Sequence, residues 1–192
     1  MPAVVTTVPV AETDSELARQ GTALCLRTWP SNPPLDPTAE SQRVIAEGAA
    51  YDGPAKKRPM LHMVIEQGTV IALARTFERI IGTQAGKLSI LALSGVVVEE
   101  NRRGQGLGRA VVQAAMERVD HDVFSFSLFQ TEHKNQGFYE GLGAMVVNNP
   151  VINSLAQPGD RMPSFNPGEL AVVYPNKPGW PSGTIDLLGS GY

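Results

Sequence analysis

Three strand-like stretches follow one another between residues 60 and 99, and they constrain the fold more than any other feature of the chain. They read MLHMVIEQ, VIALARTFERII and LSILALSGVVVEE, and only Gly68–Thr69 and GTQAG separate them. Connections this short join antiparallel neighbours, because parallel strands need a crossover of a dozen residues or more. The sequence therefore predicts an antiparallel meander in the middle of the chain.

The flanking segments predict helices and further strands. VVTTVPV reads as an edge strand because it contains Pro9, and the spacing of Thr13 and Glu16 is that of a capping box opening a first helix. A second helix is expected over about 39–50. After the meander come a helix, the strand DVFSFSLFQ, the short helix HKNQGFYEGLG and the strands AMVV and ELAVVYP. The predicted order is β-α-α-β-β-β-α-β-α-β-β, an α/β fold with a mixed, mostly antiparallel central sheet flanked by helices.

Composition limits the possible partners. The 192 residues suffice for one domain, and 42% of them are hydrophobic, which is enough to form a core. The net charge of −3 argues against nucleic acid as a partner. No apolar run approaches the ~20 residues of a membrane span, and the N-terminus lacks the basic region of a signal peptide. A single cysteine, Cys25, suits a reducing compartment. We expect a cytoplasmic protein that binds neither nucleic acid nor a membrane.

The segment NRRGQGLGRAVV, residues 101–112, combines glycines and arginines directly after the meander and before a helix. A Walker P-loop requires a lysine and then a serine or threonine after its last glycine, but an arginine and an alanine follow Gly108. A dinucleotide fingerprint requires G-x-G-x-x-G, whereas Gly104, Gly106 and Gly108 stand at every second position. Glycines still let backbone amides converge on an anion, and the helix adds its positive end. A phosphate cradle is favoured, and a plain flexible turn with solvated arginines is the alternative.

The two longest motifs resemble those of the GNAT superfamily of N-acetyltransferases. VVVEENRRGQGLGRAVV is similar to its acetyl-CoA signature, whose R/Q-x-x-G-x-G/A core falls on Arg103, Gly106 and Gly108, and NQGFYEGLGA is similar to its second motif. The resemblance covers about residues 1–175, which are expected to form the acetyltransferase domain, with 176–192 as a C-terminal tail folded on it. It implies a GNAT-type sheet, acetyl-CoA as cosubstrate and no metal.

The resemblance also implies where acetyl-CoA lies. In GNAT folds the fourth strand, here about 90–99, splays from the fifth, here 122–130, and the pantetheine arm pairs with the exposed backbone. The pyrophosphate is held by loop amides, and Arg102, Arg103 and Arg109 add charge there, with the arginine that contacts the phosphate left open. The implied cofactor contacts are Val96, Val97, Val98, Arg103, Gly104, Gln105, Gly106, Leu107, Gly108, Arg109 and Asn135. Many relatives carry the asparagine seven positions before the tyrosine of the second motif, where this chain has Glu132.

Catalytic residues are harder to assign. In the family, the tyrosine at position 139 is expected to act as general acid toward the departing CoA thiolate; without the family, Tyr139 reads as a core aromatic. Several GNAT enzymes place a glutamate on the fourth strand, where this chain has Ala92 and Ser94, and Ser94 could hold a relay water. Other polar residues are interpreted as structural, paired or exposed rather than catalytic, namely His62, His133, Glu66 and Glu78, and Cys25 as an inert core thiol.

The tail WPSGTIDLLGSGY is faintly similar to the ends of aminoglycoside 2′-N-acetyltransferases, which suggests a drug-like amine as acceptor. The carboxylate of Tyr192 would then attract the acceptor ammonium. Packing of the tail on a sheet edge or on a dimer partner is the alternative.

The sequence therefore predicts an enzyme that moves acetyl from acetyl-CoA to a primary amine, most simply that of a small molecule, in a ternary complex. A catalytically silent acyl-CoA-binding module and a protein or peptide N-acetyltransferase are the other hypotheses. The sequence leaves a homodimer open.

Overall fold

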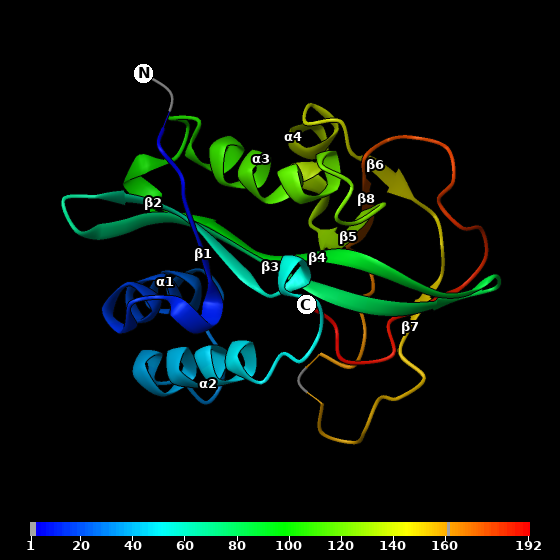
Figure 1. The fold of residues 1–192 in the computed structure, drawn as a ribbon, viewed down its shortest axis with the longest axis horizontal. Helices are drawn as coiled ribbons and strands as arrows, with labels where there is room; N and C mark the ends of the chain where they lie inside the picture. The colour runs from blue at the N-terminus through cyan, green and yellow to red at the C-terminus, as the bar shows by residue number, and fades with distance from the viewer. Residues whose placement is uncertain (1–2, 161) are drawn as a thin grey trace. The chain divides into compact units, whose positions relative to one another are not determined.

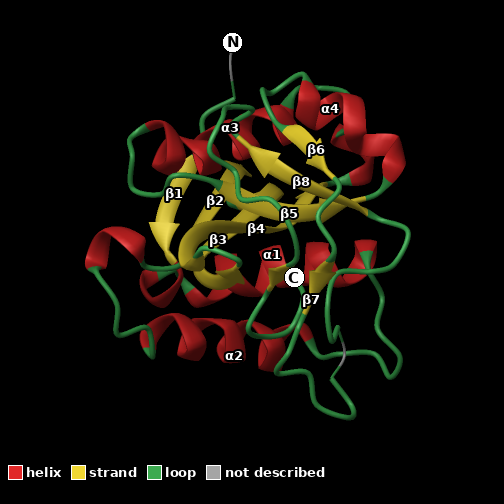
Figure 2. Ribbon diagram, turned by 90° about the vertical axis from the view of Figure 1, so that its right-hand side faces the viewer, coloured by secondary structure: helices red, strands yellow, loops and turns green. Residues whose placement is uncertain are grey.

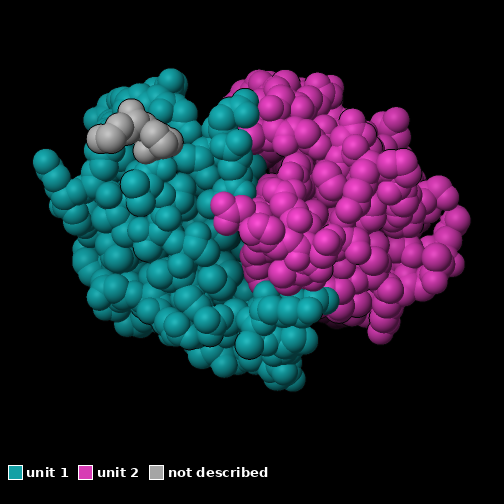
Figure 3. Space-filling model, turned by 45° about the horizontal axis from the view of Figure 1, so that its top comes forward, with its two compact units in different colours: residues 1–77, 94–115 teal, residues 78–93, 116–192 magenta. Residues whose placement is uncertain are grey.

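A computed structural model describes residues 3–160 and 162–192, and the chain divides into two compact units. Unit 1 is built from residues 1–77 and 94–115, and unit 2 from residues 78–93 and 116–192 (Figure 3). The chain passes from one unit to the other inside two long strands and one helix, so these elements contribute residues to both.

The elements follow the predicted order, with short strands added near the C-terminus. The strands are β1 (Thr6–Pro9), β2 (Met60–Glu66), β3 (Thr69–Thr83), β4 (Gly86–Val98), β5 (Ser127–Thr131), β6 (Met145–Val147), β7 (Val151–Ile152), β8 (Leu170–Tyr174) and β9 (Ile185–Asp186). The α-helices are α1 (Ser15–Thr28), α2 (Pro37–Ala49), α3 (Leu107–Asp120) and α4 (Gln136–Glu140). Short 3₁₀ turns are η1 (Val10–Glu12), η2 (Ala55–Lys57), η3 (Glu100–Arg102) and η4 (His133–Asn135).

Unit 1 is an antiparallel sheet covered by two helices. β1 pairs with β2 and β2 with β3, all antiparallel, and α1 and α2 lie together beside these strands (Figure 1). Apolar positions of α1 recur at helical spacing, so that Leu17, Gly21 and Leu24 turn inward, and Gly21 lets the helix approach Leu73 of β3. The buried cluster contains Val10, Leu24, Leu61, Met63, Val70, Leu73 and Val97.

A buried histidine links β1, β2 and β3. Nδ1 of His62 lies 3.1 Å from Oγ1 of Thr7 on β1, and Nε2 lies 3.0 Å from Oγ1 of Thr76 on β3. The ring is fully buried, and both nitrogens have a partner. The interpretation of His62 as a structural residue is confirmed.

Unit 2 contains parallel strand pairs, β4 with β5 and the two-residue pair of β7 with β9. β4 runs parallel to β5, with Leu91 opposite Ser127 and Ala92 opposite Leu128, because α3 forms the crossover between them. β5 and β6 each pair antiparallel with β8 (Figure 2). The sheet order is β1-β2-β3-β4-β5-β8-β6, with β9 on β3 and β7 on β9. The fold is therefore a mixed α/β fold with a largely antiparallel sheet flanked by helices, as predicted.

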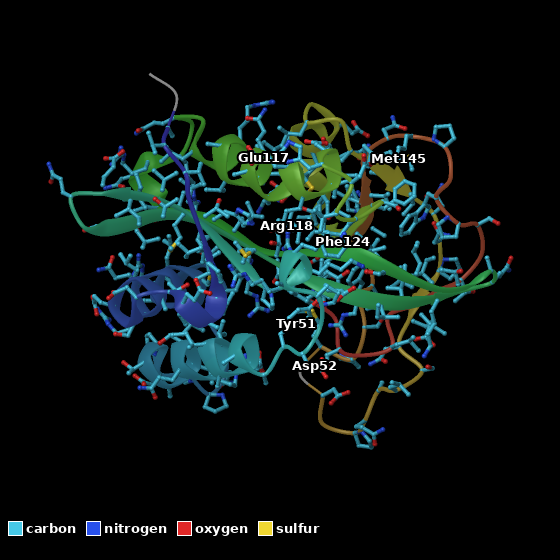
Figure 4. The ribbon with its side chains drawn as sticks, in the orientation of Figure 1. Tyr51, Asp52, Glu117, Arg118, Phe124 and Met145 are labelled. Atoms are coloured by element: carbon cyan, nitrogen blue, oxygen red, sulfur yellow. The ribbon has the colours of Figure 1, made fainter. Side chains whose placement is uncertain are left out.

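The fifth strand is shorter than the predicted range 122–130, because its first residues serve to end α3. The amides of Val123 and Phe124 donate to the carbonyl of Arg118, and Asp122 has a φ of +57°. The guanidinium of Arg118 lies 5.1 Å from the centre of the Phe124 ring (Figure 4). These contacts hold 122–124 in a turn, so regular pairing begins only at Ser127.

The tail contains a short strand that the sequence analysis did not predict. Ile185 and Asp186 form β9, which pairs with Gly82 of β3 and with β7. Ile185 and Leu187 are fully buried. A strand of this length carries no detectable period, so only its tertiary partners define it.

The predicted capping box is also corrected by one residue. The N-cap of α1 is Asp14, whose Oδ1 accepts hydrogen bonds from the amides of Glu16 (2.9 Å) and Leu17 (3.1 Å). Thr13 Oγ1 instead donates to the carbonyl of Pro9 at 2.9 Å. A carboxylate at the N-cap also interacts favourably with the positive end of the helix.

Replacing this cap should destabilise unit 1. We expect Asp14→Ala to lower the free energy of unfolding by about 1 kcal/mol, because two helix amides lose their acceptor. Urea denaturation followed by circular dichroism measures the change. Ser15→Ala is the matched control, an exposed neighbour expected to change stability by less than about 0.5 kcal/mol. Equal losses in the two variants would contradict Asp14 as the cap.

Candidate functional site

The predicted site residues divide between the two units. Unit 1 holds Ser94, the three valines and the glycine loop, and unit 2 holds Asn135, Tyr139 and Tyr192.

In unit 1, β4 changes geometry shortly before the valines. Gly95 lies inside the strand with a φ of +62°, a left-handed conformation that favours glycine and marks an irregularity in the strand. Val97 then points into the core, whereas Val96 and Val98 are half-buried. The amide of Glu99 donates to Ile71 of β3 at 2.8 Å. Because backbone groups alternate in direction along a strand, those of Val96 and Val98 face away from β3.

The glycine loop leads from β4 into the first turn of α3. Gly104 and Gly106 adopt φ values of +79° and +81°, and a Cβ at either position would meet no atom within 4 Å. Ala110 N donates to the Gly106 carbonyl at 3.0 Å, which closes the first helical turn. The amides of an α-helix's first turn have no acceptor within the helix, so here those of Leu107, Gly108 and Arg109 point out of its N-terminal end. The loop thus combines open space over left-handed glycines with a helix N-terminus, the arrangement that suits an anionic phosphate.

Arg102 holds this loop in place. Its Nη1 and Nη2 each lie 2.8 Å from a carboxylate oxygen of Glu66 on β2, and its Nε donates to Oε1 of Gln105 at 3.1 Å. The hydrogen bonds from Arg102 hold the pKa of Glu66 below its ordinary value. Glu66 is therefore a paired residue, as interpreted from the sequence. Its partnership with Arg102 joins residues 36 apart in the chain, so no sequence pattern could have revealed it.

Arg103 turns back toward the end of β4. Its Nε donates to the carbonyl of Val98 at 3.3 Å. The two neighbouring arginines thus make different contacts, because Arg102 is bound by a carboxylate and Arg103 by a neutral carbonyl. The positive charge of Arg103 has no carboxylate in this contact to balance it, which makes it the better candidate for a phosphate.

Cys25 of α1 is held near Gly95. Its Sγ donates weakly to the Gly95 carbonyl at 3.9 Å. Burial raises the pKa of the thiol to about 11. A thiol with so high a pKa carries almost no thiolate at neutral pH, in agreement with an inert core residue.

In unit 2, Tyr139 lies on α4 and is almost completely buried. Its ring centre lies 4.7 Å from that of Phe129 and 4.9 Å from that of Phe138. Burial raises the pKa of Tyr139 to about 12, and a hydrogen bond with the Thr131 side chain partly opposes that rise. Asn135 Nδ2 donates to Oγ1 of the same threonine at 3.2 Å. Asn135 and Tyr139 therefore approach a common residue, Thr131, which sequence reasoning had not singled out.

Tyr192 is docked on β5. Its hydroxyl donates to the Leu128 carbonyl at 2.9 Å, and its own backbone oxygen accepts from Nε2 of Gln130 at 3.2 Å. The ring packs edge-on against Phe165, with centres 5.3 Å apart, and the Arg79 guanidinium lies 5.3 Å from its centre. Burial raises the pKa of the phenol, which therefore stays neutral. The cation of Arg79 beside Tyr192 weakens the case for an ammonium-attracting site at this position.

The remaining polar candidates occupy structural or exposed positions. Glu78 accepts a hydrogen bond from Ser89 at 2.6 Å, and His133 is exposed. Among residues 3–160 and 162–192, no three histidine, cysteine, aspartate or glutamate side chains gather as a metal site. No helix in the same ranges is long and apolar enough to cross a membrane.

Comparison with known proteins identifies the family of the central segment. Residues 60–143, which hold the meander, the glycine loop and the second motif, match the model of the acetyltransferase (GNAT) domain. Residues 60–143 are therefore similar to a GNAT acetyltransferase domain. The resemblance drawn from the motifs is thereby confirmed. No curated protein matches the sequence.

Solved structures show the same fold at low sequence identity. An aminoglycoside 6′-N-acetyltransferase complexed with coenzyme A aligns with a TM-score of 0.59 and 15% identity, over 88% of this chain and 95% of that one. Glucosamine-6-phosphate N-acetyltransferase from Arabidopsis thaliana aligns with a TM-score of 0.56 and 18% identity, over 73% of this chain and 90% of that one. A GCN5-related N-acetyltransferase from Kribbella flavida also aligns with a TM-score of 0.56 and 18% identity. The alignment covers 75% of this chain but only 33% of that one. The GNAT fold supports acetyl transfer in general.

The glycine loop can be tested directly. We expect Gly106→Val to weaken coenzyme A binding by at least about tenfold. A valine in the left-handed conformation is strained by ~1–2 kcal/mol or more, so the loop backbone changes conformation and its amides no longer point toward the phosphate. Isothermal titration with coenzyme A measures the affinity.

Gly68→Val is the matched control. Gly68 has a φ of +76° and open space around it, but it lies in the β2–β3 turn of the same unit. Both variants should lose similar stability, and only the variant at 106 should lose affinity. Native affinity in a folded Gly106→Val protein would show that the loop is no phosphate cradle.

Proposed function

We propose that this protein transfers acetyl from acetyl-CoA to the primary amine of a small molecule, by direct attack in a ternary complex. The observation that carries the proposal is the glycine loop at the N-terminus of α3, within a segment that matches the GNAT domain. The names of two similar structures add support, since an aminoglycoside and glucosamine 6-phosphate are both small amines.

The loop amides hold the pyrophosphate in this proposal. Gly104 and Gly106 leave room for phosphate oxygens, the first-turn amides of α3 donate to them, and Arg103 adds charge. The backbone groups of Val96 and Val98 that face away from β3 pair with the pantetheine arm. A backbone amide in the same stretch polarises the thioester carbonyl as the amine attacks, so that the oxyanion is stabilised by a fixed dipole.

Tyr139 supplies the proton at the sulfur. The amine nitrogen bonds to the thioester carbon, the C–S bond breaks, and the departing thiolate accepts a hydrogen bond and then the proton from the phenol. The amide nitrogen then loses its surplus proton to water, and the phenolate regains a proton from water. With a pKa of about 12, the phenol remains protonated at neutral pH and is ready to donate. Since a thiol has a pKa of ~8.5, complete transfer from so weak an acid is unfavourable, and the phenol assists departure rather than driving it.

The acceptor must lose a proton before it can attack. An alkyl amine with a pKa of ~10.4 is mostly ammonium at neutral pH. Ser94 is half-buried on β4, next to Gly95. In this proposal its hydroxyl holds a water molecule that takes up the proton of the acceptor ammonium. Tyr192 remains a second candidate for orienting the amine, through the backbone oxygen that Gln130 holds. The absence of a strand carboxylate at Ala92 and Ser94 is the observation that favours the rival, a silent acyl-CoA-binding module.

The proposal extends to location and partners. Acetyl-CoA is an intracellular cosubstrate, and the single cysteine suits a reducing cytoplasm. The net charge of −3 favours a small cationic amine over a nucleic acid. Neither a membrane nor a metal is needed by the chemistry proposed.

A panel of amines separates the candidate functions. Incubation of the protein with acetyl-CoA and each amine, with thiol release as the readout, should show acetylation of at least one small primary amine. Acetylation of peptide N-termini or lysines alone would support the protein N-acetyltransferase. Coenzyme A binding without turnover on any amine would support the silent module and contradict the proposal.

Removing the phenol tests its role. We expect Tyr139→Phe to lower kcat by about 10- to 100-fold, with the acetyl-CoA dissociation constant unchanged, because only transition-state stabilisation is lost. Tyr174→Phe is the matched control. Tyr174 lies on β8, its phenol also has a pKa of about 12, and its hydroxyl donates to Asp120 at 2.6 Å. A similar loss in both variants would assign the effect to packing.

The pH dependence follows from the same pKa. Tyr139 loses its proton only near pH 12, so its ionisation should not lower kcat between pH 7 and 10. Deprotonation of the acceptor should make kcat/KM rise over that range. Steady-state rates measured from pH 6 to 10 test this, and a falling limb near pH 8 that Tyr139→Phe abolishes would contradict it.

A further inference from the structure

Unit 1 contains a half-buried arginine, Arg75 of β3, whose charge is not paired with a carboxylate. Its guanidinium carbon lies 5.2 Å from the centre of the Phe77 ring, on the same strand and in the same unit. Within residues 3–160 and 162–192, no carboxylate lies at ion-pair distance from this guanidinium. An arginine removed from water normally has an anionic partner, because desolvation of the charge is unfavourable. The Phe77 ring compensates only in part.

The carboxylates that influence Arg75 from α2 are bound by another arginine. Nε of Arg43 donates to Oε2 of Glu40 at 3.0 Å, and its Nη1 donates to Glu47. Both glutamates raise the pKa of Arg75, Arg43 lowers it, and desolvation is the largest effect and also lowers it. The guanidinium remains charged, since an arginine keeps its proton in proteins. Arg75 is therefore a cation whose neighbouring carboxylates are already bound.

The register of β3 and β4 places Arg75 beside the irregularity at Gly95. The amide of Glu99 donates to the carbonyl of Ile71, and the two strands are neighbours in the sheet. Antiparallel strands run past each other residue by residue. Four residues onward from Ile71 on β3 therefore correspond to four residues back from Glu99 on β4, which sets Arg75 opposite Gly95.

The side chain of Arg75 lies on the face of the sheet that α1 covers. A Cβ at Gly21 of α1 would lie 3.3 Å from the side chain of Leu73, so Leu73 points toward that helix. Side chains two positions apart on a strand share a face, which gives Arg75 the same direction. Cys25 of α1 lies over Gly95, because a Cβ there would be 3.6 Å from its Sγ.

We propose that Arg75 binds an oxyanion, a carboxylate or a phosphate, that the acceptor amine itself carries. The inference rests on the proposed function, in which Ser94, the residue before Gly95, holds the relay water. A planar guanidinium offers parallel N–H donors that match the oxygens of both groups. An acceptor held at Arg75 by its oxyanion places its amine near Ser94, so the substrate class is a small amine that also carries a negative charge.

Matched pairs of primary amines test this substrate class. Each pair differs by one oxyanion, as O-phosphoethanolamine differs from ethanolamine and an α-amino acid from its carboxamide. In the best pair, the native protein should show a kcat/KM at least about tenfold higher for the charged member, the size of one charge-assisted hydrogen bond. The readout is the ratio within a pair. Comparison of that ratio between variants cancels any difference in amine pKa.

Three variants separate the charge of Arg75 from its packing. Arg75→Met keeps much of the apolar stem and should lower the ratio about tenfold or more. Arg75→Lys keeps the charge and should retain part of the preference. Arg58→Met is the matched control in the same unit, because Glu12 binds Arg58 at 2.7 Å, and it should leave the ratio unchanged.

The outcomes distinguish this inference from the proposed function. If amines are acetylated but the ratio is the same in Arg75→Met as in the native protein, the inference alone is overturned. If no amine is acetylated, the proposed function fails, and a phosphate titration without turnover decides whether Arg75 binds an oxyanion.

That titration uses the native protein, labelled with ¹⁵N at arginine and saturated with coenzyme A so that the proposed cofactor site is filled. Inorganic phosphate should shift the Nε–H resonance of Arg75, which is assigned by its absence from Arg75→Lys. The resonance of Arg58 should stay in place. An Arg75 resonance that phosphate leaves unmoved would overturn the inference.

Discussion

The backbone hydrogen bonding of β4 is the constraint on which the structure depends. In unit 2, Leu91 and Ala92 are fully buried, and the strand pairs there with the parallel β5. In unit 1, the same strand passes the left-handed Gly95 and directs the backbone of Val96 and Val98 away from β3. Buried backbone groups must be paired, so a stretch of strand that faces away from its neighbour is available for a bound ligand's polar atoms.

Part of the positive charge near the glycine loop holds the loop itself in place. Glu66 binds Arg102 through both carboxylate oxygens, and Arg102 also binds Gln105, so part of the local positive charge orders the loop. An exposed pair of this kind contributes little free energy, but its two parallel bonds fix geometry. In the proposed function, the backbone amides bind the pyrophosphate and Arg103 supplements them.

Burial sets the chemistry of the second motif. An aromatic environment around Tyr139 keeps its phenol neutral, and the hydroxyl of Thr131 moderates that effect. A neutral phenol suits a reaction that ends in a thiolate, since the group must donate and must not carry charge beforehand. The phenol of Tyr192 in the tail is also kept neutral by desolvation, and its hydroxyl donates to the Leu128 carbonyl.

The sequence by itself determined the meander, the order of the predicted elements, the glycine loop and the family, because periodicity, short connections and glycine spacing are local properties. Tertiary structure alone decided that Glu66 binds Arg102, that Thr131 binds Asn135, and that 185–186 form a strand. The pairing of Glu66 with Arg102 crosses 36 positions, and the strand at 185–186 pairs with β3, about a hundred positions earlier. Thr131 lies close to its partners in sequence, but a single threonine has no spacing rule to reveal it. Such contacts depend on where the folded backbone places each side chain, and no local pattern encodes that placement.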